Sequence, residues 1–482
     1  MLKKKEKNTP APLTERKTKI ICTIGPSCES VEKIKELLMA GMNVARLNMS
    51  HGSIYLHQKL LNNIKKARAE LNVPCAIMVD TCGPEMRIGT FKDGHITLSR
   101  GQVFTFYFAE IEGDEEGVAL TFPKLAKCVQ EGQKIYASNG LLEFTVKRVD
   151  KKCIECIVDV GGELSNHKSV SIKGVDMDLP FLGVKDEANL KFAVENKVEY
   201  ISASFVSKVK DVKEMRDYLS SINGKCAIIS KIESETGVKN ADEIIEASDG
   251  IMVARGDLGT AIDIERIPLV QRELVEKALA KSKMVIVATE MLESMTHFSR
   301  PTRAETTDVA LAVYENATAT MLSGETSSGE YPVEACKTMS NIALASEENI
   351  NYGQVALNVT EDTSFLKSLC QSASFQANIL GAKAIVCFTN NGLTAKLISS
   401  FRPKAPIIAI AHDEMTYNAL SLAWGVVPVI TKSVKKLDKM IEFARDIVCE
   451  MGVARAGDEI VLTLSLPLND EAGTDTIHIL TI

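Results

Sequence analysis

Lys231 and Glu233 stand two residues apart at the end of an apolar run, so on an extended strand their side chains share one face. Glu233 and Asp257 offer two carboxylates, the hard oxygen ligands that suit Mg²⁺ or Mn²⁺. A lysine beside them would stabilise negative charge that develops on a substrate. The alternative is a buried Lys231–Glu233 ion pair with no part in the chemistry.

Groups that bind anions occur in the same pattern. Arg46 ends another apolar run and offers a planar fork suited to a phosphoryl group. After Ala254, the residues Arg255, Gly256 and Asp257 would present free backbone N–H groups at the start of a short helix, where a carboxylate can bind. Together these groups predict a small acidic substrate that carries both a phosphate and a carboxylate.

Polar residues follow most of the short apolar runs of the chain. A single residue of this kind caps the next helix about as often as it serves chemistry, but seven such ends on one rim are hard to explain by capping alone. The seven ends are Arg46–Gly52, Asp80–Thr81, Ser204, Lys231–Glu233, Ala254–Asp257, Thr289–Glu290 and Ser323–Thr326.

Eight apolar runs, most of them separated by helix-length segments, would position these residues. The runs are Lys19–Ile24, Asn43–Asn48, Cys75–Asp80, Tyr200–Val206, Cys226–Ile232, Gly250–Ala254, Met284–Thr289 and Ala319–Leu322. Continuous Val, Ile and Ala are typical of parallel strands covered on both faces. Eight such units predict an α/β fold, a (β/α)8 TIM barrel whose active site lies at the carboxyl ends of the strands. The first helix would begin after Ser30 and end at Gly41.

Two further units interrupt and follow this barrel. Residues 88–185 contain alternating stretches such as His95–Phe108 and many glycines, which predicts a small β-barrel domain inserted after the third strand. From Asp362 onward, short apolar runs alternate with helical patterns, which predicts a C-terminal open α/β domain. We therefore expect the barrel at 1–87 and 186–350, the inserted domain at 88–185 and the C-terminal domain at 351–482.

The composition is that of an ordinary globular protein. The 482 residues carry a net charge of −7, with 45% hydrophobic and 25% charged residues, which argues against disorder and against an overall basic surface for nucleic acid. Neither an apolar leader nor a run of 18 apolar residues occurs, so we expect no signal peptide and no membrane span. The 12 scattered cysteines suit a reducing cytoplasm, and we interpret the single CxxC, at Cys153 and Cys156, as part of a strand rather than a zinc site.

Eight segments in order resemble motifs of the pyruvate kinase family, and the resemblance covers nearly the whole chain. They are TKIICTIGPS (Thr18–Ser27), GMNVARLNMSHG (Gly41–Gly52), DTCGPEMR (Asp80–Arg87), SKIESETG (Ser230–Gly237), SDGIMVARGDLG (Ser248–Gly259), ATEMLESM (Ala288–Met295), RPTRAE (Arg300–Glu305) and MLSGET (Met321–Thr326). Any one of them could be coincidence, whereas the ordered set is highly specific.

This resemblance implies transfer of the phosphoryl group of phosphoenolpyruvate to ADP, which gives pyruvate and ATP. Glu233 and Asp257 would hold the Mg²⁺ or Mn²⁺ on the substrate side, and Lys231 would stabilise the phosphoryl group and the enolate. Arg46 would grip the substrate phosphate, and Thr289 would contact the carboxylate or methylene end, near the proton delivered to the enolate.

Further assignments follow from the same resemblance. Asn48, Ser50, Asp80 and Thr81 would bind K⁺, with Ser204 beside them, and Glu85 follows the pattern that goes with a need for K⁺. On the nucleotide side, Arg87 and Lys168 would reach the ADP phosphates, and Pro26 and His51 the adenosine. The inserted domain would act as a lid that excludes water, and the family resemblance suggests a homotetramer.

Several residues depart from the family pattern. Cys82 replaces a Lys, Glu290 a Gln and Ala261 a Glu, while Ser138-Asn139, Ser171 and Lys173 differ in the inserted domain. These changes put lid closure and nucleotide binding in doubt more than the core chemistry. They motivate one alternative, a catalytically impaired paralogue with a regulatory or ligand-binding function. Another alternative, an aldolase that forms a Schiff base on Lys231, is disfavoured by the Glu233 and Asp257 pair.

The C-terminal domain contains a loop, Thr389–Thr394, that aligns with the family's effector loop. Thr389, Asn391, Gly392 and Thr394 would bind a sugar phosphate through hydroxyls and backbone N–H groups. The alternative is a plain strand-to-helix turn, because Asn391 replaces a hydroxyl residue. The acidic stretch Asn469–Glu471 argues somewhat against a bisphosphorylated effector.

Overall fold

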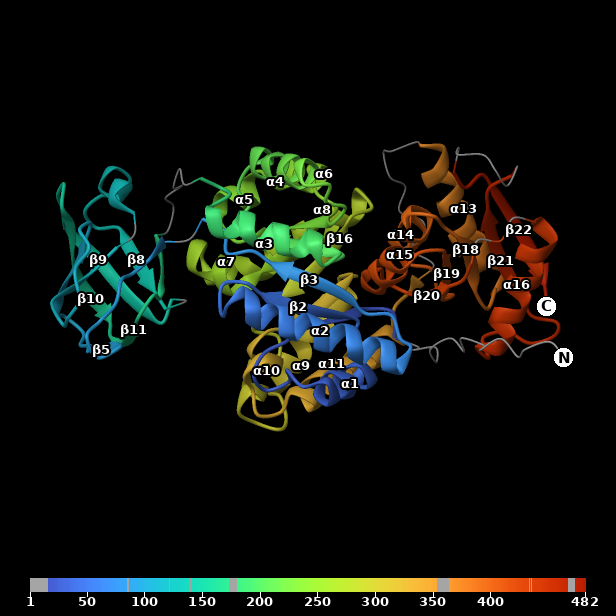
Figure 1. Cartoon of the computed structure of the whole chain (residues 1–482), viewed down its shortest axis with the longest axis horizontal. Helices are drawn as coiled ribbons and strands as arrows, with labels where there is room; N and C mark the ends of the chain where they lie inside the picture. Colours follow the sequence, from blue (N-terminus) through green and yellow to red (C-terminus); the bar gives the residue numbers. More distant parts are fainter. Residues whose placement is uncertain are drawn as a thin grey trace.

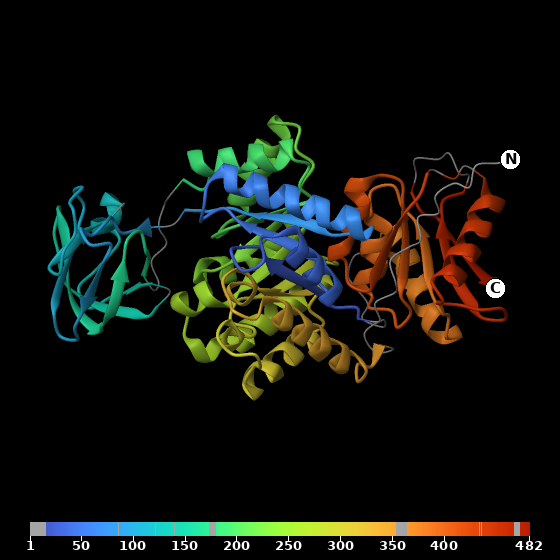
Figure 2. The ribbon, with the colours of Figure 1, turned by 60° about the horizontal axis from the view of Figure 1, so that its bottom comes forward.

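The computed structural model describes the chain in three units. It describes residues 16–84, 86–120, 122–138, 140–172, 180–352, 364–432, 434, 436–466 and 473–482. The inserted β domain lies at one end of the molecule, the barrel lies in the middle, and the C-terminal domain lies at the other end (Figure 1). The same order is seen after rotation (Figure 2). Among the described residues, no helix is long and apolar enough to cross a membrane.

The central unit is the predicted barrel of eight parallel strands. The strands are β1 (Lys19–Thr23), β2 (Val44–Asn48), β3 (Ala76–Asp80), β13 (Tyr200–Ala203), β14 (Ala227–Ile232), β15 (Gly250–Ala254), β16 (Met284–Ala288) and β17 (Ala319–Leu322). They close in the order β1-β17-β16-β15-β14-β13-β3-β2. Nearly every residue in them is buried, as expected for strands covered on both faces. The predicted fold class is confirmed.

Helices surround the strands and connect them. They are α1 (Val31–Ala40), α2 (Ile54–Leu71), α3 (Val184–Glu195), α4 (Val209–Ser221), α5 (Glu235–Lys239), α6 (Ala241–Ala247), α7 (Arg255–Ala261), η2 (Ile264–Arg266), α8 (Ile267–Ala280), η3 (Glu293–Thr296), α9 (Arg303–Tyr314), α10 (Gly324–Ser327) and α11 (Pro332–Glu347). The Ser30 side chain accepts the Lys33 N–H and caps α1, and Gly41 ends that helix with a φ of 120°. Both predicted ends of the first helix are therefore confirmed.

The inserted domain is a curled β structure. Its strands are β4 (Met86–Arg87), β5 (His95–Leu98), β6 (Val103–Tyr107), β7 (Gly117–Ala119), β8 (Lys134–Ala137), β9 (Leu142–Val149), β10 (Cys153–Val160), β11 (Gly162–Ser165) and β12 (Ser169–Ile172), with η1 at Pro123–Lys127. One sheet has the order β4-β12-β8-β9-β10-β6-β7, and β11 pairs with β5. Most pairs are antiparallel, but β6 and β7 run parallel because residues 108–116 carry the chain back before β7 begins.

The C-terminal domain is an α/β layer structure built on one sheet. Its elements are α13 (Phe365–Leu380), β18 (Ile385–Phe388), α14 (Leu393–Ser400), β19 (Ile407–Ala411), α15 (Glu414–Ala419), η4 (Leu420–Leu422), β20 (Val426–Ile430), α16 (Leu437–Glu450), β21 (Glu459–Leu464) and β22 (Thr476–Thr481). The order is β20-β19-β18-β21-β22, with β22 antiparallel to β21. Strand β22 was not predicted from the sequence, although Ile477 and Ile479 alternate there with polar residues.

The C-terminal domain closes the end of the barrel that faces away from the inserted domain. Leu422 of η4 belongs to the same apolar cluster as the inward-facing barrel residues Ile21, Met78 and Met321. The Tyr200 hydroxyl on β13 donates to the Ala419 carbonyl at 2.7 Å. This contact leaves the opposite end of the barrel, where the strands finish, as the mouth that faces the inserted domain (Figures 1 and 2).

Candidate active site

Lys231 lies at the centre of the polar residues at the barrel mouth. Its side chain is only 10% exposed, at the end of β14. The ammonium donates to the Ser204 hydroxyl at 2.9 Å and forms ion pairs with Glu233 Oε1 at 2.9 Å and Asp80 Oδ1 at 3.4 Å. The predicted shared face of Lys231 and Glu233 is therefore present, and two neighbouring strands add the other oxygens.

Arg46 extends this network to β2 and β1. Its Nε donates to Asp80 Oδ2 at 3.0 Å, and a second guanidinium nitrogen contacts the same oxygen. Its remaining terminal nitrogen donates to the Thr23 hydroxyl at 2.9 Å. Asp80 thus lies between two cations, Arg46 and Lys231, which hold it from opposite sides.

Burial and neighbouring charges set the protonation of these groups. Burial alone would lower the pKa of Lys231, but the Asp80 and Glu233 carboxylates outweigh it, so the pKa is raised and the ammonium stays charged. Burial alone would raise the pKa of Asp80, and Arg46 and Lys231 reverse this, so that pKa is lowered. Burial and the nearby Asp257 charge raise the pKa of Glu233 despite Lys231. The Glu233 carboxyl therefore favours its protonated form until a further positive charge, such as a bound cation, lies beside it.

The Glu233 and Asp257 carboxylates fit a divalent cation. Glu233 Oε2 accepts the Phe205 N–H at 2.6 Å, whereas Oε1 accepts no hydrogen bond and only pairs with Lys231. Asp257 lies in the first turn of α7 and raises the Glu233 pKa, which reports that its charge is close. In the described part of the chain no group of three or more His, Cys, Asp or Glu residues is placed to hold a metal ion. A divalent cation here would need oxygens from substrate or water as well.

The four residues predicted to bind K⁺ lie at the ends of β2 and β3. Asp80 Oδ1 is buried and accepts no hydrogen bond, although Lys231 is nearby, so this oxygen can still serve a cation. Asn48 Oδ1 accepts the Ser50 N–H at 3.1 Å. The Thr81 carbonyl accepts the Ser204 hydroxyl at 2.7 Å, which joins Ser204 to this group as predicted. Carboxylate, amide, hydroxyl and carbonyl oxygens suit a hard cation.

Thr289 lies in a backbone conformation that non-glycine residues rarely adopt. Its φ is 69°, and that of the following Glu290 is 54°. The conformation turns the Thr289 hydroxyl toward α7, where it accepts the Gly256 N–H at 2.7 Å. Thr289 and Gly256, which the sequence predicted at one substrate end, therefore touch each other.

Arg255 binds protein groups in this structure. One guanidinium nitrogen donates to Asp308 at 2.7 Å, and the other donates to the Thr289 carbonyl at 2.8 Å. The side chain is buried and joins α7 to α9 and to the loop after β16. This geometry supports a positioning role for its side chain and leaves its backbone at the start of α7.

The predicted nucleotide residues gather around one side of the mouth. Partial burial and the positive charges of Arg87, Lys185, Lys168 and Arg46 in its vicinity lower the pKa of His51. Arg87 on β4 donates to the His167 carbonyl at 2.7 Å, and Ile88 N–H donates to the carbonyl of Lys168, which immediately precedes the adjacent strand β12. Pro26 is exposed on the loop after β1.

The structure describes the contacts or backbone conformation of three residues that depart from the family pattern, Cys82, Ser171 and Ser138. Cys82 is half-buried, and its thiol donates to the Met49 carbonyl. The Ser171 hydroxyl donates to the Thr260 hydroxyl at 3.3 Å, a contact between the inserted domain and α7. Ser138 has a φ of 52°. Glu85, Asn139 and Lys173 lie outside the described residues.

The loop predicted to bind an effector is tied internally. Thr389 accepts the Gly392 N–H at 3.0 Å, Asn391 accepts the Leu393 N–H at 3.1 Å, and Thr394 shares a 2.7 Å hydrogen bond with Thr474. Gly392 has a φ of 82°, which suits glycine. The acidic stretch 469–471 lies outside the described residues.

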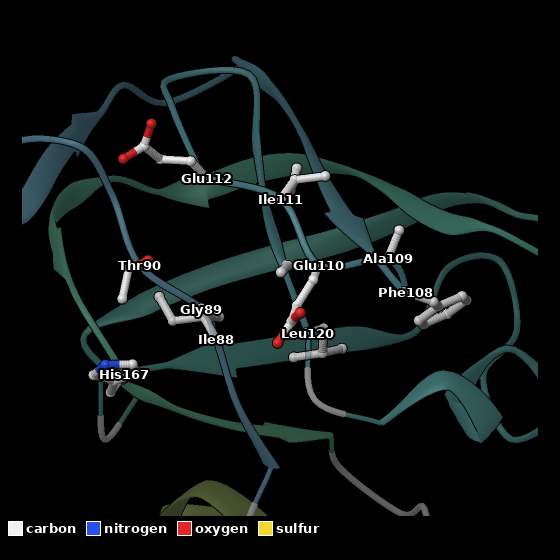
Figure 3. A pocket seen from close by; sticks show the side chains of 11 residues that line it. Ile88, Gly89, Thr90, Phe108, Ala109, Glu110, Ile111, Glu112, Leu120 and His167 are labelled. Atoms are coloured by element: carbon white, nitrogen blue, oxygen red, sulfur yellow. The ribbon is translucent and has the colours of Figure 1, made fainter.

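Two cavities lie away from the mouth. One of about 690 Å³ is in the inserted domain, between Ile88, Leu120 and Phe108, with Glu110 and His167 at its sides (Figure 3). Another of about 660 Å³ lies between α2 and the C-terminal domain. The predicted catalytic residues line neither of them, so the mouth is defined by the convergence of its side chains.

Two residues that contact the site, Phe205 and Asp186, were not predicted from the sequence. Phe205 has a φ of 57°, and this aims its N–H at Glu233. Asp186 is buried at the start of α3 and accepts the Cys82 N–H at 2.8 Å. An Asp three residues after Gly183 signals a helix cap, but nothing in the sequence indicated its second partner, about 100 residues earlier in the chain.

Comparison with known proteins finds one family along most of the chain. Families described as "Pyruvate kinase, barrel domain" and "Pyruvate kinase, alpha/beta domain" match residues 15–336 and 367–480. The pyruvate kinase of Geobacillus stearothermophilus is 41% identical over 470 residues, which cover 96% of this chain and 80% of that protein. The pyruvate kinase of Staphylococcus aureus strain MRSA252 is 42% identical over 468 residues with the same coverage.

A solved structure shows the same likeness in three dimensions. The crystal structure of a pyruvate kinase from Cryptosporidium parvum matches with a TM-score of 0.91 and 35% identity, and the match covers 99% of this chain and 97% of that one. The sequence likeness spans both the barrel and the C-terminal domain, and the shared fold includes the inserted domain. The chain therefore belongs to the pyruvate kinase family and is an enzyme of the pyruvate kinase type, a glycolytic phosphotransferase.

Proposed function

We propose that this enzyme transfers the phosphoryl group of phosphoenolpyruvate to ADP through the residues at the barrel mouth. The observation that carries the proposal is the buried network in which Lys231 contacts Ser204, Glu233 and Asp80 while Arg46 holds the other side of Asp80. Two cations in a largely buried mouth are suited to a substrate that carries a phosphate and a carboxylate.

The two ends of the substrate have different partners in this proposal. Arg46 binds the phosphate with the guanidinium face that Asp80 does not occupy. The backbone at the start of α7, at Gly256 and Asp257, binds the carboxylate, and Arg255 keeps that backbone against the loop after β16. The reacting atoms then lie between Arg46 and α7, beside Lys231.

Lys231 stabilises the charge that moves during the reaction. As the phosphoryl group leaves, negative charge develops on its oxygens and on the enolate oxygen, and the raised pKa of Lys231 keeps its ammonium charged at that point. Thr289, fixed by its hydrogen bond with Gly256, lies at the methylene end where the enolate takes up a proton. These groups are held by strand ends, so little rearrangement is needed.

Both cation sites belong to the proposal. Glu233 and Asp257 would hold Mg²⁺ or Mn²⁺, and Asn48, Ser50, Asp80 and Thr81 would hold K⁺. Such cations neutralise the transferring phosphoryl group and orient its oxygens. Glu233 Oε1 and Asp80 Oδ1 are buried carboxylate oxygens that already attract the Lys231 ammonium, and this supports the assignment.

The nucleotide occupies the side of the mouth near the inserted domain. Arg87 and Lys168 bind the ADP phosphates, and Pro26 and His51 contact the adenosine. The positive charges that lower the His51 pKa support a polyphosphate there. The inserted domain then acts as a lid and excludes water that would hydrolyse the phosphoryl group.

A measurement of pyruvate release tests the function. With phosphoenolpyruvate and ADP, we expect pyruvate to form only when Mg²⁺ or Mn²⁺ is present, and K⁺ to raise the rate. Absence of pyruvate under every cation condition would favour the alternative, a catalytically impaired paralogue with a regulatory function. Trapping of a substrate imine on Lys231 by borohydride would instead support an aldolase.

We also propose a homotetramer built through two faces. Large apolar side chains are exposed on the barrel at Ile264, Leu269 and Phe298, and on the C-terminal domain at Ile379 and Ile479. Strand β22 is an edge strand with one described neighbour, β21. Two separate self-contacts close a tetramer as a dimer of dimers. Light scattering should report a tetramer for the natural chain and dimers for Phe298→Glu, whereas a natural monomer would contradict the assignment.

Two further assignments concern the location of the protein and an effector. All twelve cysteines are free thiols, which supports a location in the reducing cytoplasm. The loop with Thr389, Asn391, Gly392 and Thr394 would take a sugar phosphate as effector. Titration of the activity with sugar phosphates and AMP tests this, since a plain turn would leave the rate unchanged.

A further inference from the structure

The barrel and the inserted domain are joined by two stretches of chain, and a carboxylate at the end of the returning stretch binds the departing one. Asp186 is the third residue of α3 and is only 3% exposed. Its Oδ1 accepts the Cys82 N–H at 2.8 Å, on the stretch that leaves the barrel after β3. Asp186 thus joins the stretch that leaves the barrel to α3, the helix at which the returning stretch ends.

This pattern goes beyond an ordinary helix cap. A carboxylate at the third helical position commonly accepts the N–H of the capping residue. The hydrogen bond from the Cys82 N–H to Asp186 instead connects residues about 100 positions apart in the sequence, which a cap does not require.

The departing stretch is also fixed against the active site. Gly83 has a φ of 70°, and a Cβ at that position would come within 2.8 Å of the Ser204 carbonyl oxygen. Ser204 in turn accepts a hydrogen bond from Lys231. Cys82 directly follows Thr81, one of the residues predicted to bind K⁺. The Asp186 carboxylate therefore binds the chain at the point where the barrel mouth becomes the connection to the inserted domain.

The two connections must keep one position relative to each other if Arg87 and Lys168 are to lie correctly over the mouth. Arg87 follows the departing stretch on β4, and Lys168 immediately precedes β12, which pairs with β4. Movement of either connection relative to the other would shift Arg87 and Lys168 relative to the mouth. A shared anchor at Asp186 gives both connections one common pivot.

We propose that Asp186 is a positioning residue that holds the two connections together, so that the inserted domain returns to one place over the nucleotide. The inference rests on the proposed function, in which Arg87 and Lys168 bind ADP. Asp186 acts through the connection rather than on substrate, because its Oδ1 accepts the Cys82 N–H. Its loss should affect ADP and leave phosphoenolpyruvate, which binds to the barrel, nearly unaffected.

The test compares Asp186→Ala with Asp186→Asn and a matched control, Asp211→Ala. Asp211 occupies the same third position of α4 and accepts the Ser207 and Lys208 N–H groups at 2.9 Å each, but neither belongs to a connection. We would measure kcat, the KM for ADP, the thermal midpoint, and direct binding of phosphoenolpyruvate without nucleotide.

For Asp186→Ala we expect the KM for ADP to rise about tenfold, as for one lost hydrogen bond to a charged group, with a lower kcat and unchanged phosphoenolpyruvate binding. Asp186→Asn should show a smaller rise, about threefold, because its amide oxygen can still accept the Cys82 N–H while one acceptor is lost. Asp211→Ala should lower the thermal midpoint and leave the ADP constant within twofold.

Two results would overturn the proposal. One is an Asp186→Ala enzyme that is less stable but has the natural KM for ADP and kcat, as expected for a cap alone. The other is equal weakening for ADP and phosphoenolpyruvate, as expected for general damage to the mouth. If Asp186→Ala does not fold, an unchanged KM for ADP in Asp186→Asn decides against it. Lack of pyruvate release by the natural enzyme would refute the proposed function instead, so the two failures are distinguishable.

Discussion

Lys231 is the side chain whose removal should most reduce turnover. In Lys231→Met the substrate keeps Arg46 and the start of α7, but the developing charge loses its ammonium partner. We expect kcat to fall by about 10²–10³, the range for loss of one preorganised charge-stabilising group. Phosphoenolpyruvate should still bind. Steady-state kinetics and direct binding check both parts.

A matched control for this variant is Lys239→Met, because Lys239 is exposed and, among the residues that the structure describes, pairs only with Glu235 on the same short helix. That enzyme should retain its natural kcat. Near-normal turnover in Lys231→Met would show that the assigned centre is wrong. A loss of substrate binding equal to the loss of kcat would show that Lys231 acts in binding rather than on the transition state.

His51 offers a reporter of the nucleotide site. Partial burial and then the charges of Arg87, Lys185 and Lys168 lower its pKa, so near neutral pH the ring is uncharged. A bound diphosphate brings negative charge to these cations and should raise the His51 pKa. Titration of its ring protons by NMR with and without ADP checks this. An unchanged or lower pKa would place the nucleotide elsewhere.

Some single residues could be assigned from the sequence and others could not. Strand alternation predicts that Lys231 and Glu233 share a face, and the contact at 2.9 Å agrees. The contacts of Phe205 with Glu233 and of Arg255 with Asp308 join segments far apart in the chain. Only the closed barrel brings such segments together, so local pattern cannot reveal them.

At the scale of elements, the hydrophobic pattern of the sequence predicts a strand most reliably where that strand is buried on both faces. The sequence predicts all eight barrel strands because a short, continuous apolar run bounded by polar residues is typical of a strand buried on both faces. Strand β22 was missed because half of it is exposed, and its pattern is short. The parallel pairing of β6 and β7 depends on a long connection whose path the sequence does not specify.

The contact between β12 and α7 should matter for closure. Ser171 donates to the Thr260 hydroxyl, which donates to the Asp257 carbonyl at 2.8 Å, so this pair links the inserted domain to α7, the helix that carries Asp257. Thr260→Val removes both bonds. We expect the KM for ADP to rise about threefold to tenfold, as for a net loss of roughly 1 kcal/mol, without a change in phosphoenolpyruvate binding.

Thr307→Val is a suitable control for Thr260→Val. Thr307 also donates its hydroxyl to a backbone carbonyl within a barrel helix, at 3.0 Å to Arg303, but within the described part of the chain it makes no hydrogen bond to the inserted domain. The two variants should lose similar stability. Equal KM values for ADP in both would show that the Ser171 contact has no part in closure.

At the scale of the whole molecule, the net charge of −7 is compatible with an anionic substrate. Binding depends on local charge, and the mouth gathers Arg46 and Lys231 beside Arg87 and Lys168. The acidic groups Glu233, Asp257 and Asp80 are the ones assigned to cations. Part of the acidic excess would then serve to bind metal ions, so removing the divalent cation should weaken the binding of phosphoenolpyruvate.

Lys19 lies where the barrel meets the C-terminal domain and should make stability depend on pH. Its ammonium donates to the Val426 carbonyl at 2.7 Å. Burial, together with the nearby Arg16 charge, lowers the pKa of Lys19 to about 7, while Glu347 acts in the opposite direction. Between this pKa and its ordinary value of 10.5, the unfolded chain binds a proton that the folded chain lacks. Stability from this group therefore rises with pH in that window.

Replacement of Lys19 by Met should remove that rise. Below pH 7 the natural chain carries the full cost of a buried charge, so the variant should be relatively more stable there. Its advantage should shrink toward pH 10.5 by at most about 1.4 kcal/mol per pH unit. The measurement is the thermal midpoint of both chains across this range, with the exposed Lys33→Met as control, and other titrating groups cancel in the difference. A difference that stays constant with pH would mean that Lys19 is charged at the junction throughout, with the Val426 carbonyl and Glu347 offsetting the cost of burial.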